Sequence, residues 1–383
     1  MFPEKLQNKL NKRIEHKTLR KLGSTHNLID FSSNDYLGFA KSDAIFTKTH
    51  EFLVKNNLKI NGATGSRLIS GNHPLYKITE NEIALFHNTP SALLFNSGYD
   101  ANIGFFSAVP QRGDIILYDE FIHASIRDGI QLSNARAYKF THNNLEDLEK
   151  LLIKNTSTET LNKPHIYVVT ESVFSMDGDS PDLKKMTHLC KKHEAFFIVD
   201  EAHAFGVFGK NGVGKIQDLQ LENEIFTRII TFGKALGCHG AVILGSEKLT
   251  QYLVNFARSF IYTTGLSPHS LATIKTSYNQ LNDTTINQLH KNIGHFKTEI
   301  TRLFLQDKFI ESNSPIHCCV ISGNEKTKTI ATNLQKKGFD VKAILSPTVS
   351  EGKERLRFCL HSYNTSTEIT KILENLALLL KDS

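Results

Sequence analysis

The chain has 383 residues, of which 40% are hydrophobic, and it carries a formal net charge of +6. This length and apolar content predict a large core and a division into a main domain and a lesser one. The basic residues are scattered rather than clustered, which argues against nucleic acid binding, and no apolar run is long enough to cross a membrane.

The N-terminus and the cysteines indicate the expected cellular compartment and the state of the thiols. The first six residues are typical of a polar helix rather than a signal peptide, so we expect a cytoplasmic protein. The basic stretch of residues 5–21 predicts an N-terminal helix that packs against one of the domains with its charges in solvent. The five cysteines have no CxxC spacing and no metal-ligand pattern, which favours reduced thiols and no metal site.

Strand-like and helix-like segments alternate from about residue 90, which predicts an α/β fold. Apolar runs typical of parallel strands covered on both faces occupy residues 92–95, 115–118, 166–169, 196–199 and 241–244. Between two of them, Pro181 and the stripe that follows it predict an amphipathic helix. From about residue 270 a helical run through Ile300, strands at residues 318–321, 341–345 and 356–360, and a final helix through Leu380 predict a smaller α+β domain. We therefore divide the chain into an N-terminal helix and arm (residues 1–45), a large domain (residues 46–270) and a small C-terminal domain (residues 271–383).

Two apolar runs end in polar residues with reactive chemistry. Residues 197–199 lead into Asp200 and then His203, and the run that begins at Ile229 leads through Thr231 to Lys234. Because ligands lie beyond the carboxyl ends of parallel strands, we expect Asp200, His203 and Lys234 to face one crevice. A lysine that forms an imine, an aspartate that holds a charged ring nitrogen and a nearby histidine are what a pyridoxal phosphate (PLP) enzyme requires. Singly, Lys234 would be a solvated loop lysine and Asp200 a helix cap; together, in this order and spacing, they predict a PLP site.

Further residues follow predicted strands. Gly98 and Tyr99 open a helix whose free backbone N–H groups could hold a phosphate, although most such turns bind nothing. His123 follows another strand, where an imidazole could stack on a planar ring, and Ser175 could donate to a polar atom of a cofactor. Without the neighbouring motifs, His123 would be a structural histidine and Ser175 an ordinary turn residue.

The sequence lacks the motifs that three other enzyme classes require. Residues 209–216 (GKNGVGKI) have the glycine and lysine skeleton of a P-loop, but Ile216 replaces the hydroxyl that would hold magnesium, which favours a glycine-rich surface loop. The sequence contains neither the HExxH pattern of metalloproteases nor the GxSxG elbow of serine hydrolases.

The motifs together resemble the α-oxoamine synthases, a family of fold-type I PLP enzymes. The resemblance includes residues 30–38 (DFSSNDYLG), 62–75 (GATGSRLISGNHPL), both signatures above, 260–268 (FIYTTGLSP) and 354–357 (ERLR). It implies a mostly parallel central sheet with helices on both faces in a PLP-binding domain of residues 46–270, and a smaller α+β domain after it. Thr64, Gly265 and Ile216 lie at positions that vary in the family, outside the core chemistry.

The resemblance also implies roles for individual residues. Lys234 is the Schiff-base lysine, Asp200 the partner of the pyridine nitrogen, His203 a contact of the phenolate, and His123 the residue that stacks on the ring beside the substrate. Further implied positions are cofactor contacts at Gly98, Tyr99 and Thr231; phosphate contacts from a partner subunit, and hence a homodimer, at Thr263 and Thr264; the clamp on the amino acid carboxylate at Arg357, with Asn34 nearby; and acyl-substrate contacts at Arg20 and Thr348.

The implied reaction joins an amino acid to an acyl thioester with loss of carbon dioxide. Residues 70–75 and the compact length favour L-alanine with pimeloyl-CoA or pimeloyl-acyl carrier protein, which would give 8-amino-7-oxononanoate for biotin biosynthesis. One alternative is glycine or serine with another acyl-CoA, as in 2-amino-3-ketobutyrate ligase, 5-aminolevulinate synthase and serine palmitoyltransferase. Another is a silent PLP-fold binding protein, which the retention of Lys234 and Asp200 argues against.

Overall fold

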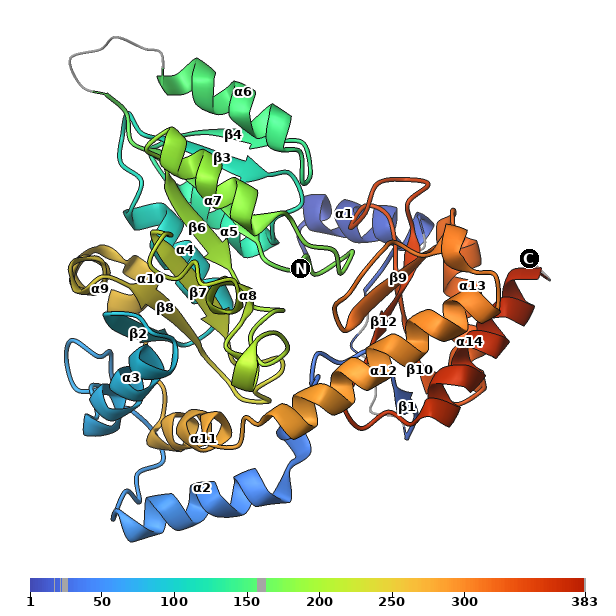
Figure 1. Ribbon diagram of the computed structural model, residues 1–383, viewed down its shortest axis with the longest axis horizontal. Helices are drawn as coiled ribbons and strands as arrows, with labels where there is room; N and C mark the ends of the chain where they lie inside the picture. The colour runs from blue at the N-terminus through green and yellow to red at the C-terminus, as the bar shows by residue number, and fades with distance from the viewer. Residues whose placement is uncertain (17, 21, 23–26, 157–162, 382–383) are drawn as a thin grey trace.

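A seven-stranded sheet is the largest element of the protein. The structure, a computed structural model, describes residues 1–16, 18–20, 22, 27–156 and 163–381. Within these residues the sheet has the strand order β2-β8-β7-β6-β5-β3-β4 and occupies the left of Figure 1. Its strands are β2 (Ser91–Phe95), β3 (Ile115–Asp119), β4 (Arg136–Phe140), β5 (Ile166–Glu171), β6 (Phe196–Asp200), β7 (Thr227–Thr231) and β8 (Ala241–Gly245).

Most neighbouring strands are parallel, but β8 is not. β7, β6, β5, β3 and β4 pair in parallel, whereas β8 pairs antiparallel with both β7 and β2. The expectation of a parallel strand at residues 241–244 is therefore wrong. Residues 232–240 connect β7 to β8, and this is shorter than the dozen or so residues that a parallel crossover needs. Strand β4 was not predicted, because it is an edge strand whose first four residues are exposed and therefore has no apolar run.

Alternate residues of each strand face opposite sides of the sheet, as a period of two requires. Ile116 and Ile198 enter one apolar cluster, whereas Leu117 and Val199 enter another. All four side chains are 0% exposed, and full burial of one such side chain contributes about 1.5–3 kcal/mol. The sheet is thus a middle layer with a core on each face.

Helices cover both of these faces. On one face lie α4 (Gly98–Ala108), α5 (Ala124–Leu132), α9 (Glu247–Phe256) and α10 (Arg258–Ile261). Apolar side chains of the other face come from α2 (Asp43–Lys55), α3 (Pro74–Phe86), α6 (Leu145–Thr156), α7 (Leu183–Lys192), α8 (Lys215–Asp218) and α11 (Pro268–Tyr278). Short 3₁₀ turns are η1 (Phe39–Lys41), η2 (Lys210–Gly212) and η3 (Gln306–Lys308).

A smaller unit lies to the right in Figure 1. Its antiparallel sheet has the order β11-β12-β9, and a short parallel pair joins β1 to β10. The strands are β1 (Ile29–Asp30), β9 (Ile316–Val320), β10 (Phe339–Asp340), β11 (Lys342–Ile344) and β12 (Arg355–Cys359). The helices are α12 (Asp283–Arg302), α13 (Asn324–Lys336) and α14 (Ser366–Lys381). Because β12 is the middle strand, its two arginines are not on an edge.

Both proposed domain boundaries fall inside helices. The one after residue 45 falls in α2, and the one after residue 270 falls in α11, which packs against α2 and α3 of the large unit. The single helical run expected through Ile300 is in fact two helices. The second helix, α12, begins after Asn282, which is its N-cap and accepts a hydrogen bond from the Thr285 N–H.

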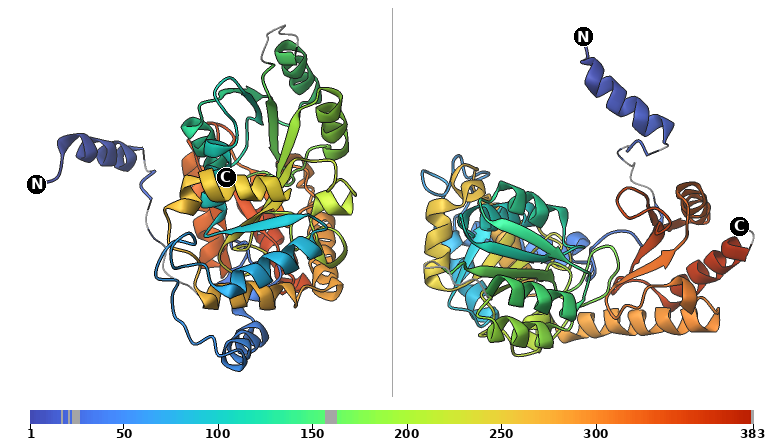
Figure 2. Two further views of the ribbon diagram at one scale, coloured as in Figure 1. Left: turned by 90° about the vertical axis from the view of Figure 1, so that its left-hand side faces the viewer. Right: turned by 90° about the horizontal axis from the view of Figure 1, so that it is seen from above.

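The N-terminal helix differs from its prediction. α1 (Glu4–Glu15) is shorter than the expected residues 5–21, and two positions of that range, Lys17 and Lys21, lie outside the described residues. The helix buries none of its residues and stands away from the rest of the chain in Figure 2, so it does not pack against either domain. Its apolar side chains, Leu6, Leu10 and Ile14, recur every fourth residue and so share one face of the helix, and all three are exposed. In the described part of the protein, every helix falls short of the length and apolarity that crossing a membrane requires.

Candidate active site

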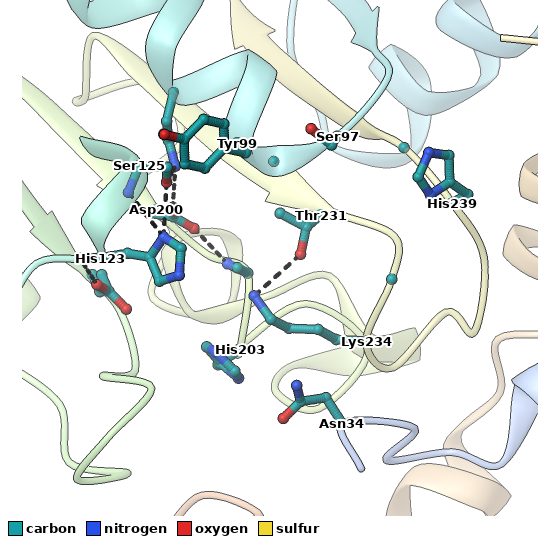
Figure 3. Close-up of a pocket in the computed structure, with 16 residues that line it drawn as sticks. Asn34, Ser97, Tyr99, His123, Ser125, Asp200, His203, Thr231, Lys234 and His239 are labelled. Carbon is teal, nitrogen blue, oxygen red and sulfur yellow. Dashed lines mark hydrogen bonds between the residues drawn. The ribbon is translucent and has the colours of Figure 1, made fainter. Parts of the chain in front are cut away.

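A cavity of about 240 Å³ lies at the carboxyl ends of the central strands. Its lining residues lie at or just after the carboxyl ends of β2, β3, β5, β6 and β7. The strand ends thus bring together residues that are far apart in sequence. In Figure 3 the side chains of His123, Asp200, His203, Thr231 and Lys234 surround one hollow. The lining residues are Asn34, Ser97, Gly98, Tyr99, Asn102, His123, Ser125, Glu171, Asp200, Ala202, His203, Thr231, Gly233, Lys234, His239 and Gly240.

Lys234 extends into this cavity from the loop after β7. Its Nζ lies 3.4 Å from Thr231 Oγ1, and the loop is closed by hydrogen bonds from the Cys238 N–H to the Phe232 carbonyl and from the Phe232 N–H to the Gly240 carbonyl. Burial lowers the pKa of Lys234 despite the opposing charges of Asp200 and Glu171. A lowered pKa increases the fraction of neutral amine, which is the form that attacks a carbonyl or accepts a proton.

Asp200 places a carboxyl group on the wall of the cavity. It is 5% exposed, and its Oδ1 accepts the Ala202 N–H at 2.9 Å. Its Oδ2 accepts from Asn102 Nδ2 at 3.1 Å, and the same amide donates to Ser125 Oγ at 2.9 Å. Asn102 and Ser125 therefore hold the carboxylate in one orientation, where it can pair with a protonated ring nitrogen.

Glu171 is the second buried carboxyl group of the site. It lies opposite Asp200 in the register of β5 and β6, and its Oε1 accepts the His123 N–H at 2.6 Å. Burial raises the pKa of Glu171 to about 8, and the nearby charge of Asp200 acts in the same direction. Glu171 therefore keeps its proton largely bound at neutral pH, because two adjacent buried carboxylates cannot both ionise cheaply.

The two histidines are neutral near pH 7. Burial lowers the pKa of His123 despite the charge of Asp200, and burial lowers the pKa of His203 well below its ordinary value, with Lys234 acting in the same direction. His123 Nδ1 lies 2.8 Å from Ser125 Oγ, and His203 Nδ1 lies 2.7 Å from the Tyr36 hydroxyl. Each ring is therefore oriented by a hydroxyl behind it and presents its other edge to the cavity (Figure 3).

The N-terminus of α4 forms a further wall of the cavity. Ser97 is its N-cap and accepts the Asp100 N–H, while the first intrahelical donor is Ala101. The N–H groups of Gly98 and Tyr99 precede that donor and are available to an anion at the positive end of the helix dipole. A Cβ on Gly98 would lie 2.3 Å from Thr231 Cγ2, so only glycine permits this close approach of helix and strand.

These groups match the polar features of PLP. The cofactor has a ring nitrogen that becomes cationic, an aldehyde that reacts with an amine, and an anionic phosphate. The cavity offers Asp200, Lys234 and the α4 N-terminus for the three in turn, and buried Asn102 keeps an Oδ1 without a hydrogen-bond partner among the described residues. The residues present therefore fit PLP.

Arg357 lies beside the cavity on β12. It is 8% exposed, and its Nε donates to the Ser175 carbonyl at 2.7 Å, its Nη1 to Cys359 Sγ at 2.8 Å and its Nη2 to Asn34 Oδ1 at 3.0 Å. Asn34 lines the cavity, so Arg357 is one hydrogen bond away from it. Ser175 contacts this network through its backbone and is not among the lining residues; its contact with a cofactor stays a prediction.

Four other predicted positions lie outside the cavity. Arg20 and Thr348 are exposed. Thr263 and Thr264 accept hydrogen bonds from Asn96 Nδ2, at 3.1 Å to Thr263 Oγ1 and 2.6 Å to the Thr264 carbonyl. Their predicted contacts cross a subunit interface, which a single chain does not test.

Several polar residues that line the cavity were not predicted from the sequence, namely Ser97, Asn102, Ser125, Glu171 and His239. Glu171 had a usable signal, because it comes two positions after the apolar run of residues 166–169, close to the strand end as Asp200 is after residues 197–199. Asn102 and Ser125 had none, since a polar residue in the first turns of a helix is ordinary.

One group of side chains has the spacing of metal ligands. His142, Asp177 and Asp179 bring potential ligand atoms within 4.8 Å of one another. The ring nitrogens of His142 lie 2.9 Å from Asp119 and 2.8 Å from Asp179, and although burial opposes it, these hydrogen bonds raise the pKa of His142 to about 9. At neutral pH the imidazole carries a proton on both nitrogens, so it has no lone pair for a metal.

Comparisons with known proteins give a consistent result. Residues 26–376 match the family model of aminotransferase class I and II. The chain is 41% identical over 367 residues to an 8-amino-7-oxononanoate synthase of Emericella nidulans, covering 91% of this chain and 88% of that protein. A serine palmitoyltransferase of S. paucimobilis, solved with PLP bound, has a TM-score of 0.87 and 26% identity over 99% of this chain and 97% of its own. An 8-amino-7-oxononanoate synthase from Francisella tularensis has a TM-score of 0.77 and 30% identity over 93% of this chain and 98% of its own.

Proposed function

The chain belongs to the aminotransferase class I and II family as a PLP-dependent acyltransferase of the α-oxoamine synthase type, and we propose that its substrates are L-alanine and a pimeloyl thioester. The product would be 8-amino-7-oxononanoate, with release of carbon dioxide and of free CoA or carrier protein. The acyl donor is pimeloyl-CoA or pimeloyl-acyl carrier protein. The fold is that of fold-type I PLP enzymes, as predicted, and PLP is the cofactor.

One observation carries this proposal. The amine of Lys234 is enclosed between the carboxylate of Asp200 and the N-terminus of α4, with two neutral histidines beside it. The identity of 41% to a relative named 8-amino-7-oxononanoate synthase then favours that synthase over its sister enzymes. A silent binding protein would not need a lysine whose pKa is lowered by burial next to an intact aspartate.

The residues of the chain have distinct tasks in this reaction. PLP, when bound, supplies an electron sink for the carbon beside the substrate amino group. Asp200 holds the proton at the ring nitrogen, and Lys234 is the base that removes the proton from the amino acid Cα. His123 and Asp200 share the wall held by Ser125 and Asn102, which keeps both groups oriented before substrate arrives.

Arg357 is proposed to bind the amino acid carboxylate. Its planar guanidinium matches a carboxylate in two parallel hydrogen bonds, which fixes the direction of the Cα bonds. The Ser175 carbonyl holds Nε, so Nη1 and Nη2, now on Cys359 and Asn34, are the groups that could turn to a substrate. Asn34 would then be the side chain that yields to the incoming carboxylate.

We further propose a homodimer in which Thr263 and Thr264 contact the cofactor phosphate of the partner subunit. The two residues are hydrogen-bonded to Asn96, and Asn96 lies between the end of β2 and the N-terminus of α4. Arg20 and Thr348 are proposed to contact the acyl substrate, and their exposure leaves them accessible to it.

A substrate panel tests the function. With PLP bound, we expect thiol release from pimeloyl-CoA to be fastest with L-alanine and slower by about tenfold or more with glycine or L-serine, because one methylene or hydroxyl changes a fitted pocket by about 10- to 200-fold. Product mass identifies 8-amino-7-oxononanoate, and repeating the panel with pimeloyl-acyl carrier protein compares the two donors. A faster reaction with glycine or serine would favour a sister enzyme, and a yellow protein without thiol release would favour the silent alternative.

A pair of arginine variants tests the carboxylate clamp. Arg357→Lys keeps the charge but loses the fork, so we expect KM for L-alanine to rise by about tenfold or more while KM for the pimeloyl thioester changes little. The matched control is Arg355→Lys on the same strand face. Arg355 pairs with Asp177 and donates to the Met176 carbonyl at 3.1 Å, so its loss should lower stability rather than alanine affinity. Equal effects on KM for alanine would mean that Arg357 is not the clamp.

A further inference from the structure

Tyr36 is a buried residue that the proposed chemistry leaves without a task. It belongs to the segment of residues 30–38 and is 0% exposed. Its hydroxyl lies 2.7 Å from His203 Nδ1 and 3.2 Å from Asn34 Oδ1. Both of those residues line the cavity, whereas Tyr36 itself does not. The hydroxyl thus sits directly behind a histidine that faces the reacting groups.

The hydroxyl has one proton and two possible acceptors. Asn34 Oδ1 already accepts a hydrogen bond from the cationic Nη2 of Arg357 at 3.0 Å, so it does not need the tyrosine proton to be satisfied. The contact with His203 Nδ1 is the shorter one, at a length typical of a strong hydrogen bond. If Tyr36 donates to Nδ1, that nitrogen has no proton of its own.

A neutral imidazole carries a proton on only one of its nitrogens, and its partner decides which. Burial lowers the pKa of His203 well below its ordinary value, so the ring holds a single proton near neutral pH. Burial also raises the pKa of Tyr36, so its hydroxyl keeps the proton that it donates. The proton of His203 must then lie on Nε2, the nitrogen on the cavity side.

We propose that Tyr36 is a positioning residue that holds His203 in the tautomer with its proton on Nε2, so that the ring donates a hydrogen bond into the cavity. The tautomer itself does not depend on the proposed function; only the identity of the acceptor, an anionic oxygen of the cofactor, rests on it. In the opposite tautomer Nε2 would present a lone pair to that oxygen and repel it. Figure 3 shows His203 beside the end of Lys234, where such a donor would act.

The chain offers a matched control for Tyr36. Tyr278 is a second tyrosine whose hydroxyl lies 3.1 Å from a buried histidine nitrogen, His87 Nε2, outside the cavity. Tyr278→Phe removes the same atom from the same kind of pair. A change seen in Tyr36→Phe but not in Tyr278→Phe therefore reports on the cavity rather than on a general loss of stability.

The decisive measurement is nitrogen NMR of the full chain labelled with ¹⁵N-histidine, with and without PLP, with His203 assigned from a His203→Gln sample. In the native protein we expect Nδ1 of His203 at the unprotonated position and Nε2 at the protonated position. Tyr36→Phe should give a mixture of tautomers, and Tyr278→Phe should leave His203 unchanged. A native His203 with its proton on Nδ1, or one unaltered in folded Tyr36→Phe, would overturn the proposal. If Tyr36→Phe does not fold, the native spectrum alone decides.

Kinetics and binding give a second readout. In Tyr36→Phe we expect PLP to bind about tenfold more weakly and kcat to fall by about tenfold, since one oriented donor is lost, while KM for L-alanine stays within about twofold. A change confined to KM for L-alanine would mean that Tyr36 acts through Asn34 and Arg357 instead. If the substrate panel shows no condensation but His203 keeps its proton on Nε2, the proposed function fails while this inference stands.

Discussion

Replacing Lys234 by alanine should lower turnover by at least about a thousandfold, because it removes both the amine that bonds to the cofactor and the base near the substrate Cα. The variant should still bind PLP, since the α4 N-terminus, Asp200 and His123 remain. In the native enzyme, borohydride reduction should attach the cofactor to the peptide that contains Lys234. Peptide mass mapping checks the attachment, and thiol release checks the rate.

Lys248 provides the control for this experiment. It lies on α9 and is exposed, so Lys248→Ala should keep native turnover and native labelling of Lys234. A cofactor mass on Lys248 or any other lysine of the native protein would remove Lys234 from its role. Lys234→Ala with more than a few per cent of native turnover would do the same.

Replacing Asp200 by asparagine should slow removal of the substrate Cα proton by about a hundred- to a thousandfold, because a neutral amide does not hold the proton at the ring nitrogen. The cofactor should stay bound. The measurement is exchange of the L-alanine Cα hydrogen for deuterium in D₂O, followed by proton NMR without any acyl thioester. This isolates the step that Asp200 serves from the later condensation.

The neighbouring residue gives a matched control. Glu201 is equally buried, but it faces away from the cavity, where it pairs with Arg228 at 3.4 Å and accepts the Ile216 N–H at 3.0 Å. Glu201→Gln should lower the free energy of unfolding and leave the exchange rate within a few-fold of native. Native exchange in Asp200→Asn with PLP bound would exclude Asp200 as the ring-nitrogen partner.

Local sequence was sufficient for the fold class and for the central groups of the site. The runs that became β3, β5 and β6 are apolar on both faces, and only a sheet covered on both sides buries such runs. The shorter apolar run that begins at Ile229 became part of β7. Because these strands are parallel, the polar residues that follow them had to meet at one edge. Asp200, His203 and Lys234 could therefore be placed together from the sequence, and the α/β fold is confirmed.

The sequence could not predict features that depend on a distant neighbour. The direction of β8 follows from its pairing between β2 and β7, and α1 has the sequence of an amphipathic helix whether or not a surface covers it. Glu171 was overlooked because its burial against Asp200 appears only when β5 and β6 pair, although the polar residue after an apolar run was visible.

By itself, then, the sequence determined which residues carry reactive groups, because those groups follow strands whose apolar pattern is local. Tertiary structure decided how each group is held. Tyr36 and His203 are 167 positions apart, and Arg357 and Asn34 are 323 apart, yet both pairs are hydrogen-bonded. No local pattern encodes such contacts, since a tyrosine in a short turn or an asparagine before it has many possible partners. Only the packing of the residue 30–38 segment between the central sheet and β12 selects these, and with them the orientation and charge state of the groups in the cavity.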